Sequence, residues 1–175
     1  TNAVDFAQEF LDSTEESLAI GVHHHSVTDT LHYVLSERGY SPLRLDGNDD
    51  KYKKDRIAND FRLGRSRILI LSSIAGGVGL NLQTCANALV LERQWNSADE
   101  EQFESRFERD GQKNAITVTY MIAKNTIDEF FHEMVAKKRL ILHETGIKGS
   151  NNEEDLTQDL NFLREFSEKV VNSRI

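Results

Sequence analysis

Short apolar stretches alternate with helical patterns along most of this 175-residue sequence. The apolar stretches lie at 18–23, 41–47, 67–71, 88–92 and 115–123. Strands that are apolar along most of their length are buried on both faces, and a helix between two strands returns the chain for parallel pairing. The alternation therefore predicts an α/β fold in three layers, a mainly parallel sheet with helices on both faces.

Helical patterns fill the intervals between these stretches. Gly39, Gly64 and Gly146 are placed to end three of the helices, and Ser97 is placed to cap a fourth. The expected helices are 4–13, 27–39, 49–64, 97–111 and 126–146, with a further one at 156–171. We therefore predict a main lobe at 1–146 and a linker with a C-terminal helical extension at 147–175.

Composition and charge exclude several classes of protein. The net charge of −8 argues against a polycation that coats nucleic acid, although a local basic patch is compatible with it. Cys85 is the single cysteine, which excludes an internal disulfide framework and favours an intracellular setting. No apolar run approaches the roughly 20 residues of a membrane helix, and no secretory signal is recognisable. Because the sequence begins without methionine, we expect a fragment of a longer protein, monomeric on its own.

A glycine-rich segment, 72–83, follows the apolar stretch at 67–71. Its glycines, Gly76, Gly77 and Gly79, allow backbone N–H groups to approach an anion closely. In parallel sheets, ligands gather at the carboxyl ends of strands, where this segment is expected. However, the sequence contains no Gly-Lys pair followed by Ser or Thr, so the lysine of a phosphate loop is missing. The segment indicates half of a nucleotide site, and a tight turn without a ligand is the alternative.

A second candidate constellation lies at 102–112. On the expected helix, Gln102, Arg106 and Arg109 share one face, and two guanidiniums with an amide suit a phosphate chain. The alternative is a solvated face on which neighbouring glutamates pair both arginines. The carboxylates available for such pairing are Glu100, Glu101, Glu104 and Glu108.

Basic residues crowd into 51–67, which we name the basic stripe. Its members are Lys51, Lys53, Lys54, Arg56, Arg62, Arg65 and Arg67. Such a stripe neutralises nucleic-acid phosphates without reading sequence, or it forms a solvated helix face. By contrast, the run from His23 to His25 favours a strand end over a metal site, because adjacent strand residues point to alternate faces.

The segments resemble the Swi/Snf-type ATPases, superfamily 2 DNA translocases that are related to helicases. Residues 72–83 resemble motif V of that family. The Gln-x-x-x-Arg-x-x-Arg-x-Gly-Gln pattern of 102–112 resembles motif VI. Upstream, 18–35 resembles motif IV and 43–61 the next block, and 119–142 resembles the helix that closes the lobe.

The resemblance covers residues 4–146 and implies the second of two RecA-like lobes that share one ATP site. The phosphate-loop lysine and the Mg²⁺ ligands of the family belong to the first lobe. The implied ligand is ATP with Mg²⁺, and the implied partners are duplex DNA and an N-terminal lobe of the same protein. The implied location is the nucleus of a eukaryote or the nucleoid of a prokaryote.

The motifs of the family also imply roles for individual residues by position. Arg106 and Arg109 correspond to arginine fingers. The residues implied to contact the nucleotide are Gln102, Gly76, Gly77, Gly79 and Asn81. Those implied to contact the DNA backbone are Asn48, Ser72 and Ser73. To these the basic stripe adds Lys53, Lys54 and Arg56 by its charge.

The sequence thus predicts the second motor lobe of an ATP-dependent DNA translocase, inactive as an ATPase by itself. One alternative is a degenerate lobe kept for protein interaction, because Glu108 and Asp110 depart from the motif VI pattern and the C-terminal tail is acidic. Another is a helicase lobe that acts on RNA or single strands. The related helicases of that kind usually carry His-Arg-x-Gly-Arg, which this sequence lacks.

Overall fold

The computed structural model describes residues 2–72, 80–93, 97–145 and 164, and its centre is a five-stranded sheet. The strands are β1 (Leu18–Val22), β2 (Leu43–Leu45), β3 (Ile68–Ser72), β4 (Asn87–Val90) and β5 (Thr117–Tyr120). They lie in the order β2-β3-β1-β4-β5, and every neighbouring pair is parallel. The predicted parallel sheet is confirmed. Consequently all five strands end at the same edge of the sheet, which we call the carboxyl edge.

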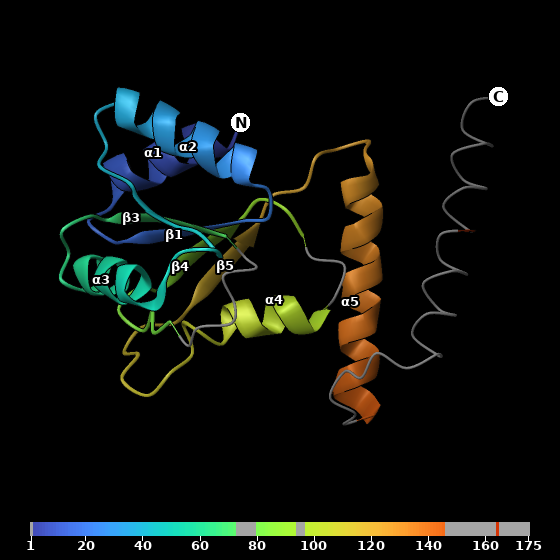
Figure 1. Ribbon diagram of the computed structural model, residues 1–175. Coiled ribbons are helices and arrows are strands. Elements are labelled where there is room, and N and C mark those ends of the chain that lie inside the picture. The colour runs from blue at the N-terminus through green and yellow to red at the C-terminus, as the bar shows by residue number, and fades with distance from the viewer. Residues whose placement is uncertain (1, 73–79, 94–96, 146–163, 165–175) are drawn as a thin grey trace. The chain divides into compact units, whose positions relative to one another are not determined.

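Helices cover both faces of this sheet, as predicted. The helices are α1 (Ala3–Ser13), α2 (His25–Glu37), α3 (Lys51–Arg62), α4 (Ser97–Glu104) and α5 (Ile127–Thr145). In Figure 1, α1 and α2 lie on one face of the sheet, and α3 and α4 lie on the other. The three-layer α/β arrangement is therefore confirmed.

Successive strand residues point to opposite faces and build two separate cores. Leu18 and Ile20 of β1 pack with α1 and α2, whereas Ala19 packs with α3 and α4. The sheet is buried along the whole of β1 and β3, which explains why those stretches read as continuously apolar.

Local chemistry sets three helix termini, of which the two glycine ends were predicted. The side chain of Asp50 accepts the backbone N–H of Lys53 at the start of α3. Gly39 and Gly64, just beyond the ends of α2 and α3, have φ angles of 88° and 71°. Side chains rarely tolerate that left-handed region, so glycine ends both helices.

One helix is shorter than predicted. α4 ends at Glu104 instead of continuing to 111, and turns follow it. The chain tightens there, because the N–H groups of Arg106 and Phe107 bond to carbonyls only three residues back. This bend buries the rings of both Phe103 and Phe107, which lie 5.3 Å apart.

The chain divides into two compact units, 1–121 and 122–175. The first holds the whole sheet with α1 to α4, and the second holds α5. The predicted boundary at 146 and the helix at 156–171 stay predictions, since 146–163 and 165–175 lie outside the described residues. Among the described helices, none is long and apolar enough to cross a membrane.

Cys85 provides a pH-dependent prediction for the fold. Burial raises the pKa of its thiol to about 11 from the ordinary 9.0. A raised pKa means that the stabilisation is complete below pH 9 and is lost as the pH rises toward 11, because the unfolded chain releases the proton first. We expect the free energy of unfolding to fall across this interval by an amount that Cys85→Ser lacks.

Urea unfolding at pH 8 and pH 10.5 measures this difference between the two proteins. Tyr40, whose pKa is raised by its hydrogen bond to Asp12, titrates in both and so cancels. Equal losses of stability in the two proteins would contradict the prediction.

Candidate functional site

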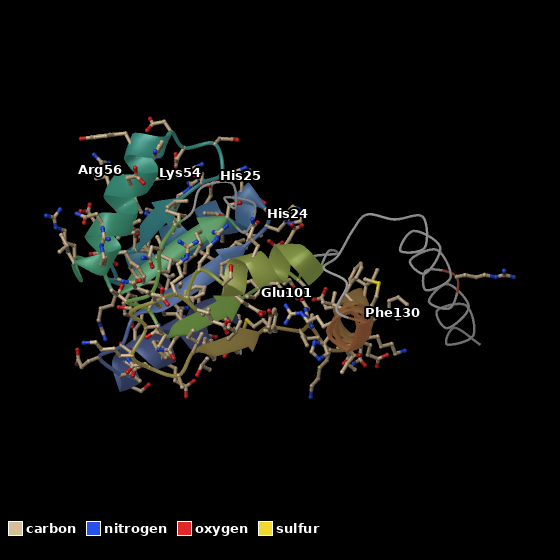
Figure 2. The ribbon with its side chains drawn as sticks, turned by 90° about the horizontal axis from the view of Figure 1, so that it is seen from below. His24, His25, Lys54, Arg56, Glu101 and Phe130 are labelled. Atoms are coloured by element: carbon tan, nitrogen blue, oxygen red, sulfur yellow. The ribbon has the colours of Figure 1, made fainter. Side chains whose placement is uncertain are left out.

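Chemistry-bearing residues gather at the carboxyl edge, where the strands end. Ser72 ends β3, Glu92 and Arg93 follow β4, and the segment 23–25 joins β1 to α2. Figure 2 labels His24, His25 and Lys54, and the contacts described below join this part of the edge to the loop after β2. Of the residues predicted to bind a ligand, Ser72 lies directly at this edge.

Arg106 is the most unusual of these residues. Its side chain is buried, with only 3% of the residue exposed, and among the described residues neither Nη1 nor Nη2 has a hydrogen-bond partner. The guanidinium lies 5.9 Å from the ring centroid of Phe103. Burial lowers the pKa of Arg106, and the positive charge of Arg109 lowers it further. The alternative of pairing with neighbouring glutamates therefore does not hold for Arg106.

The backbone of Arg106 has a structural role that is separate from its side chain. Its carbonyl accepts the N–H of Leu82 at 3.1 Å, which ties motif VI to the end of the glycine-rich segment. This bond joins backbone atoms only, so it remains when the side chain at position 106 is replaced. The Arg106 side chain is therefore not needed for it and is available for another role. Arginine keeps its proton in proteins, and a buried cation without a partner is costly. An anion brought to the two free nitrogens would offset that cost.

The other residues predicted to contact the nucleotide differ in their position and hydrogen bonding. Arg109 and Gln102 are exposed, and the positive charge of Arg109 contributes to the lowered pKa of Arg106. They do not share a helical face, because only Gln102 lies on α4. Asn81 bonds locally, since its amide accepts from the N–H of Gln83 and donates to the Gln83 side chain.

Ser73, Gly76, Gly77 and Gly79 lie outside the described residues, and their roles stay predictions. Ser72, the last residue of β3, is described and buried.

Gln112 has a role that the sequence did not predict. Its Nε2 donates to the carbonyl of Cys85 at 3.1 Å, and its Oε1 accepts the N–H groups of Lys113 and Asn114. The preceding Gly111 has φ of 104°, and a Cβ there would lie 3.2 Å from the amide of Gln83. The Gly-Gln pair of the motif therefore shapes the backbone that carries both arginines.

A buried ion pair was also missed by the sequence reasoning. Arg93 bonds to Glu100 through two parallel contacts, Nε to Oε1 at 3.0 Å and Nη2 to Oε2 at 2.6 Å. The guanidinium of Arg93 also lies 4.4 Å from the ring centroid of Tyr120, whose hydroxyl donates to Glu104. These contacts fasten α4 to the ends of β4 and β5. The only signal was the pattern of an arginine after one strand and a glutamate in the next helix.

Glu92, which follows β4, binds the first two residues of the histidine run. The Oε2 of Glu92 accepts the backbone N–H groups of His23 and His24 at 2.6 and 2.9 Å, and Oε1 contacts His24 Nδ1 at 2.6 Å. Burial alone would raise the pKa of Glu92, yet the hydrogen bonds from His24 and His23 hold it below its ordinary value. Within the described part of the chain, no group of three His, Cys, Asp or Glu side chains is placed to hold a metal ion.

The basic stripe separates into two parts. At one end, Arg67 donates to the carbonyls of Leu11 and Thr14 and so completes the end of α1, while Arg65 pairs with Asp60. These arginines precede β3 and therefore lie away from the carboxyl edge. At the other end, Lys53, Lys54 and Arg56 begin α3 directly after the loop that follows β2.

The three predicted DNA contacts at the start of α3 differ in their surroundings. Arg56 is exposed, and Lys53 is exposed with its Nζ 2.5 Å from Asp49 Oδ1. Lys54 is buried, at 6% exposure, and its Nζ donates to the carbonyl of Gly47 at 2.6 Å. The expectation that Lys54 lies on an exposed stripe was wrong, because its position on α3 faces the sheet beside Ile57 and Phe61.

Comparisons with known proteins agree with this arrangement. The family model "Helicase conserved C-terminal domain" matches residues 3–111. One solved structure, the C-terminal part of the Fun30 ATPase domain, has a TM-score of 0.70 and 30% identity. That match covers 75% of this chain and 44% of the other.

Curated relatives come from several organisms. The SWI/SNF-related matrix-associated actin-dependent regulator of chromatin subfamily A-like protein 1 of Xenopus tropicalis is 25% identical over 97% of this chain and 18% of its own length. DNA repair protein RAD5A of Arabidopsis thaliana is 34% identical over 65% and 11%. ATP-dependent helicase FUN30 of Saccharomyces cerevisiae is 35% identical over 66% and 10%. This chain thus spans less than a fifth of each relative.

The family match, the parallel sheet and the Fun30 structure agree with the resemblance in the motifs. The chain therefore belongs to the helicase conserved C-terminal domain family, as a C-terminal RecA-like lobe of the Swi/Snf type.

Proposed function

We propose that this lobe is the second half of an ATP-driven motor that moves along duplex DNA. The observation that carries the proposal is the Arg106 guanidinium, which is buried and positively charged, and whose Nη1 and Nη2 have no hydrogen-bond partner within the described part of the chain. A terminal phosphate of ATP, held by the other lobe of the same protein, is the anion that fits it.

The chemistry is hydrolysis of the bond between the β–γ bridging oxygen and the γ-phosphorus. Water forms a new bond to phosphorus, and ADP leaves with the electrons of the broken bond. Arg106 and Arg109 stabilise the negative charge of the transferring group by donating hydrogen bonds. Gln102, which is exposed on α4, contacts ATP or couples ATP hydrolysis to the DNA.

Metal chemistry is assigned to the other lobe. The groups that this lobe offers to the nucleotide are guanidiniums, which suit phosphate oxygens and do not bind cations. We therefore place the Mg²⁺ ligands and the phosphate-loop lysine outside this chain. When bound there, Mg²⁺ supplies positive charge to the phosphate oxygens.

DNA binding is assigned to the carboxyl edge and the start of α3. Asn48, Lys53 and Arg56 are the described candidates that are exposed, and Ser72 and Ser73 are candidates by position. Contacts of this kind neutralise or bond phosphates and carry no sequence information. Relatives named for chromatin and for DNA repair favour a location where DNA is present.

The proposal predicts a division of activity between the two lobes. We expect the isolated chain to hydrolyse no ATP, and the full protein with both lobes to hydrolyse ATP faster when duplex DNA is added. Phosphate release with and without duplex DNA, with a heat-inactivated sample as control, measures both. Turnover by the isolated chain, or a full protein that ignores DNA, would contradict the proposal. A full protein without any turnover would instead support the non-enzymatic alternative.

A further inference from the structure

The loop between β2 and α3, residues 46–50, is held by an internal set of charged contacts. Lys54, on the first turns of α3, reaches back from a buried position, and its Nζ donates to the Gly47 carbonyl at 2.6 Å. The side chain is buried on α3 together with Ile57 and Phe61. Lys54 therefore fixes where Gly47 lies relative to the helix.

Asp49 closes the same loop from inside. Its Oδ2 accepts the N–H of Asp46 at 2.8 Å, its own N–H donates to the Asp46 carbonyl at 3.2 Å, and Lys53 bonds its Oδ1. Burial would raise the pKa of Asp49, but hydrogen bonds from Lys53 and from the Asp46 N–H, with nearby lysine charges, hold it below the ordinary value. The carboxylate thus stays ionised and able to accept.

Asp46 links the loop to two other elements. Its Oδ1 lies 3.2 Å from Nδ1 of His25, the first residue of α2, and its Oδ2 accepts Arg44 Nε at 2.8 Å. Both flanks of Gly47 and Asn48 are therefore tied down. Asn48 lies between these anchors and is exposed, so its side chain stands at the tip of a braced turn.

We infer that Lys54 and Asp49 are positioning residues, which shape the 46–50 loop so that Asn48 meets a DNA phosphate, and that Lys54 itself touches no DNA. This inference rests on the proposed function, since it concerns the DNA contact of the same lobe. It differs from a charge effect, because one of the two residues is a cation and the other an anion.

The opposite charges give the sharpest test. Removing a carboxylate that merely repels phosphates strengthens DNA binding, whereas removing one that shapes the loop weakens it. We expect both Lys54→Met and Asp49→Ala, in the full two-lobed protein, to weaken binding of fluorescent duplex DNA about tenfold, the size of one lost hydrogen bond to a charged group. Lys54→Arg, which keeps a donor for the Gly47 carbonyl, should restore most of the affinity.

Salt dependence separates positioning from direct contact. A lysine that neutralises a phosphate contributes about 0.9 to the slope of log affinity against log salt. We expect Lys54→Met to leave this slope unchanged. Arg62→Met, which removes an exposed cation at the far end of α3, is the control for loss of charge and should keep the affinity of the unchanged protein.

A double-mutant cycle links the effect to Asn48. If Lys54 acts through the loop, then Lys54→Met added to Asn48→Ala costs little further affinity. Melting temperatures of all variants show whether each is folded, and Lys54→Arg with Asp49→Ala test the inference even if Lys54→Met unfolds.

Three results would overturn the inference: a slope that falls by about 0.9 in Lys54→Met, tighter binding by Asp49→Ala, or additive losses with Asn48→Ala. A further result would overturn the proposed function instead, namely unchanged protein that binds no duplex DNA at all. The two failures are distinguished by the measurement on the unchanged protein.

Discussion

Arg106→Met should lower the ATP turnover of the full two-lobed protein by about 10³- to 10⁵-fold, the range for loss of an arginine finger. The reason is that Nη1 and Nη2 of Arg106 are buried with no hydrogen-bond partner in the described parts of the lobe, and so can donate to the transferring phosphoryl group. Methionine removes the charge but keeps much of the volume. Phosphate release at saturating ATP and duplex DNA measures the effect.

The same substitution should leave the lobe as stable as before, or stabilise it. A buried charge without a partner is unfavourable, and the backbone bond from Leu82 to the Arg106 carbonyl survives the change. Lys113→Met, at an exposed cation nearby, is the control and should keep its turnover. Near-normal turnover in Arg106→Met, or a large loss of stability, would show that the guanidinium is a structural group.

Arg93→Met should destabilise the lobe by about 3–5 kcal/mol, because it leaves the Glu100 carboxylate buried without its cation. The pair is nearly inaccessible, with side-chain exposures of 7% for Arg93 and 2% for Glu100. The pair also joins α4 to the end of β4, and the backbone that carries Arg106 directly follows α4. Urea unfolding of the isolated chain measures the loss.

Two matched variants sharpen this measurement. Arg38→Met removes the partner of Asp5 in an exposed pair, with exposures of 38% and 48%, and should cost less than about 1 kcal/mol. Arg93→Met combined with Glu100→Leu removes both buried charges and should recover much of the stability. Equal costs for the exposed and the buried pair would contradict the argument.

Much of the fold was predictable because the burial of each element determines where apolar residues occur along it. β1 and β3 are buried along their whole length, and their apolar residues stand in continuous runs that only a covered parallel sheet explains. Likewise the ends of α2 and α3 were marked by glycines that occupy the left-handed region. These signals are local, so no knowledge of distant contacts was needed.

The site was predicted in part. The motif pattern selected Arg106 and Arg109, and the structure buries Arg106, whose Nη1 and Nη2 have no hydrogen-bond partner in the described ranges. Yet the helix expected to carry both arginines ends at Glu104, because Phe103 and Phe107 pack against the sheet and the backbone tightens around them. Helical periodicity is read along a single element, so it does not reveal where packing against the sheet ends a helix.

Charge in the sequence misled the prediction for Lys54 and for the far end of the basic stripe. A lysine in a basic run was expected at the surface, but its position one residue after Lys53 turns it toward Gly47 and the core. Arg67 likewise completes the end of α1 instead of joining a DNA surface. The direction of a side chain depends on which face of its helix is covered, and the sequence of the stripe does not state that.

By itself, the sequence determined the layered α/β fold, the order of its elements and the motif residues that assign the family, because these follow from local patterns along the chain. Only the tertiary structure decided which charged groups serve the fold and which remain available to a ligand. Arg93 and Lys54 find partners seven residues away, while the terminal nitrogens of Arg106 have no hydrogen-bond partner among the residues that the structure describes. The reason is that burial and pairing of a charge depend on every element packed around it.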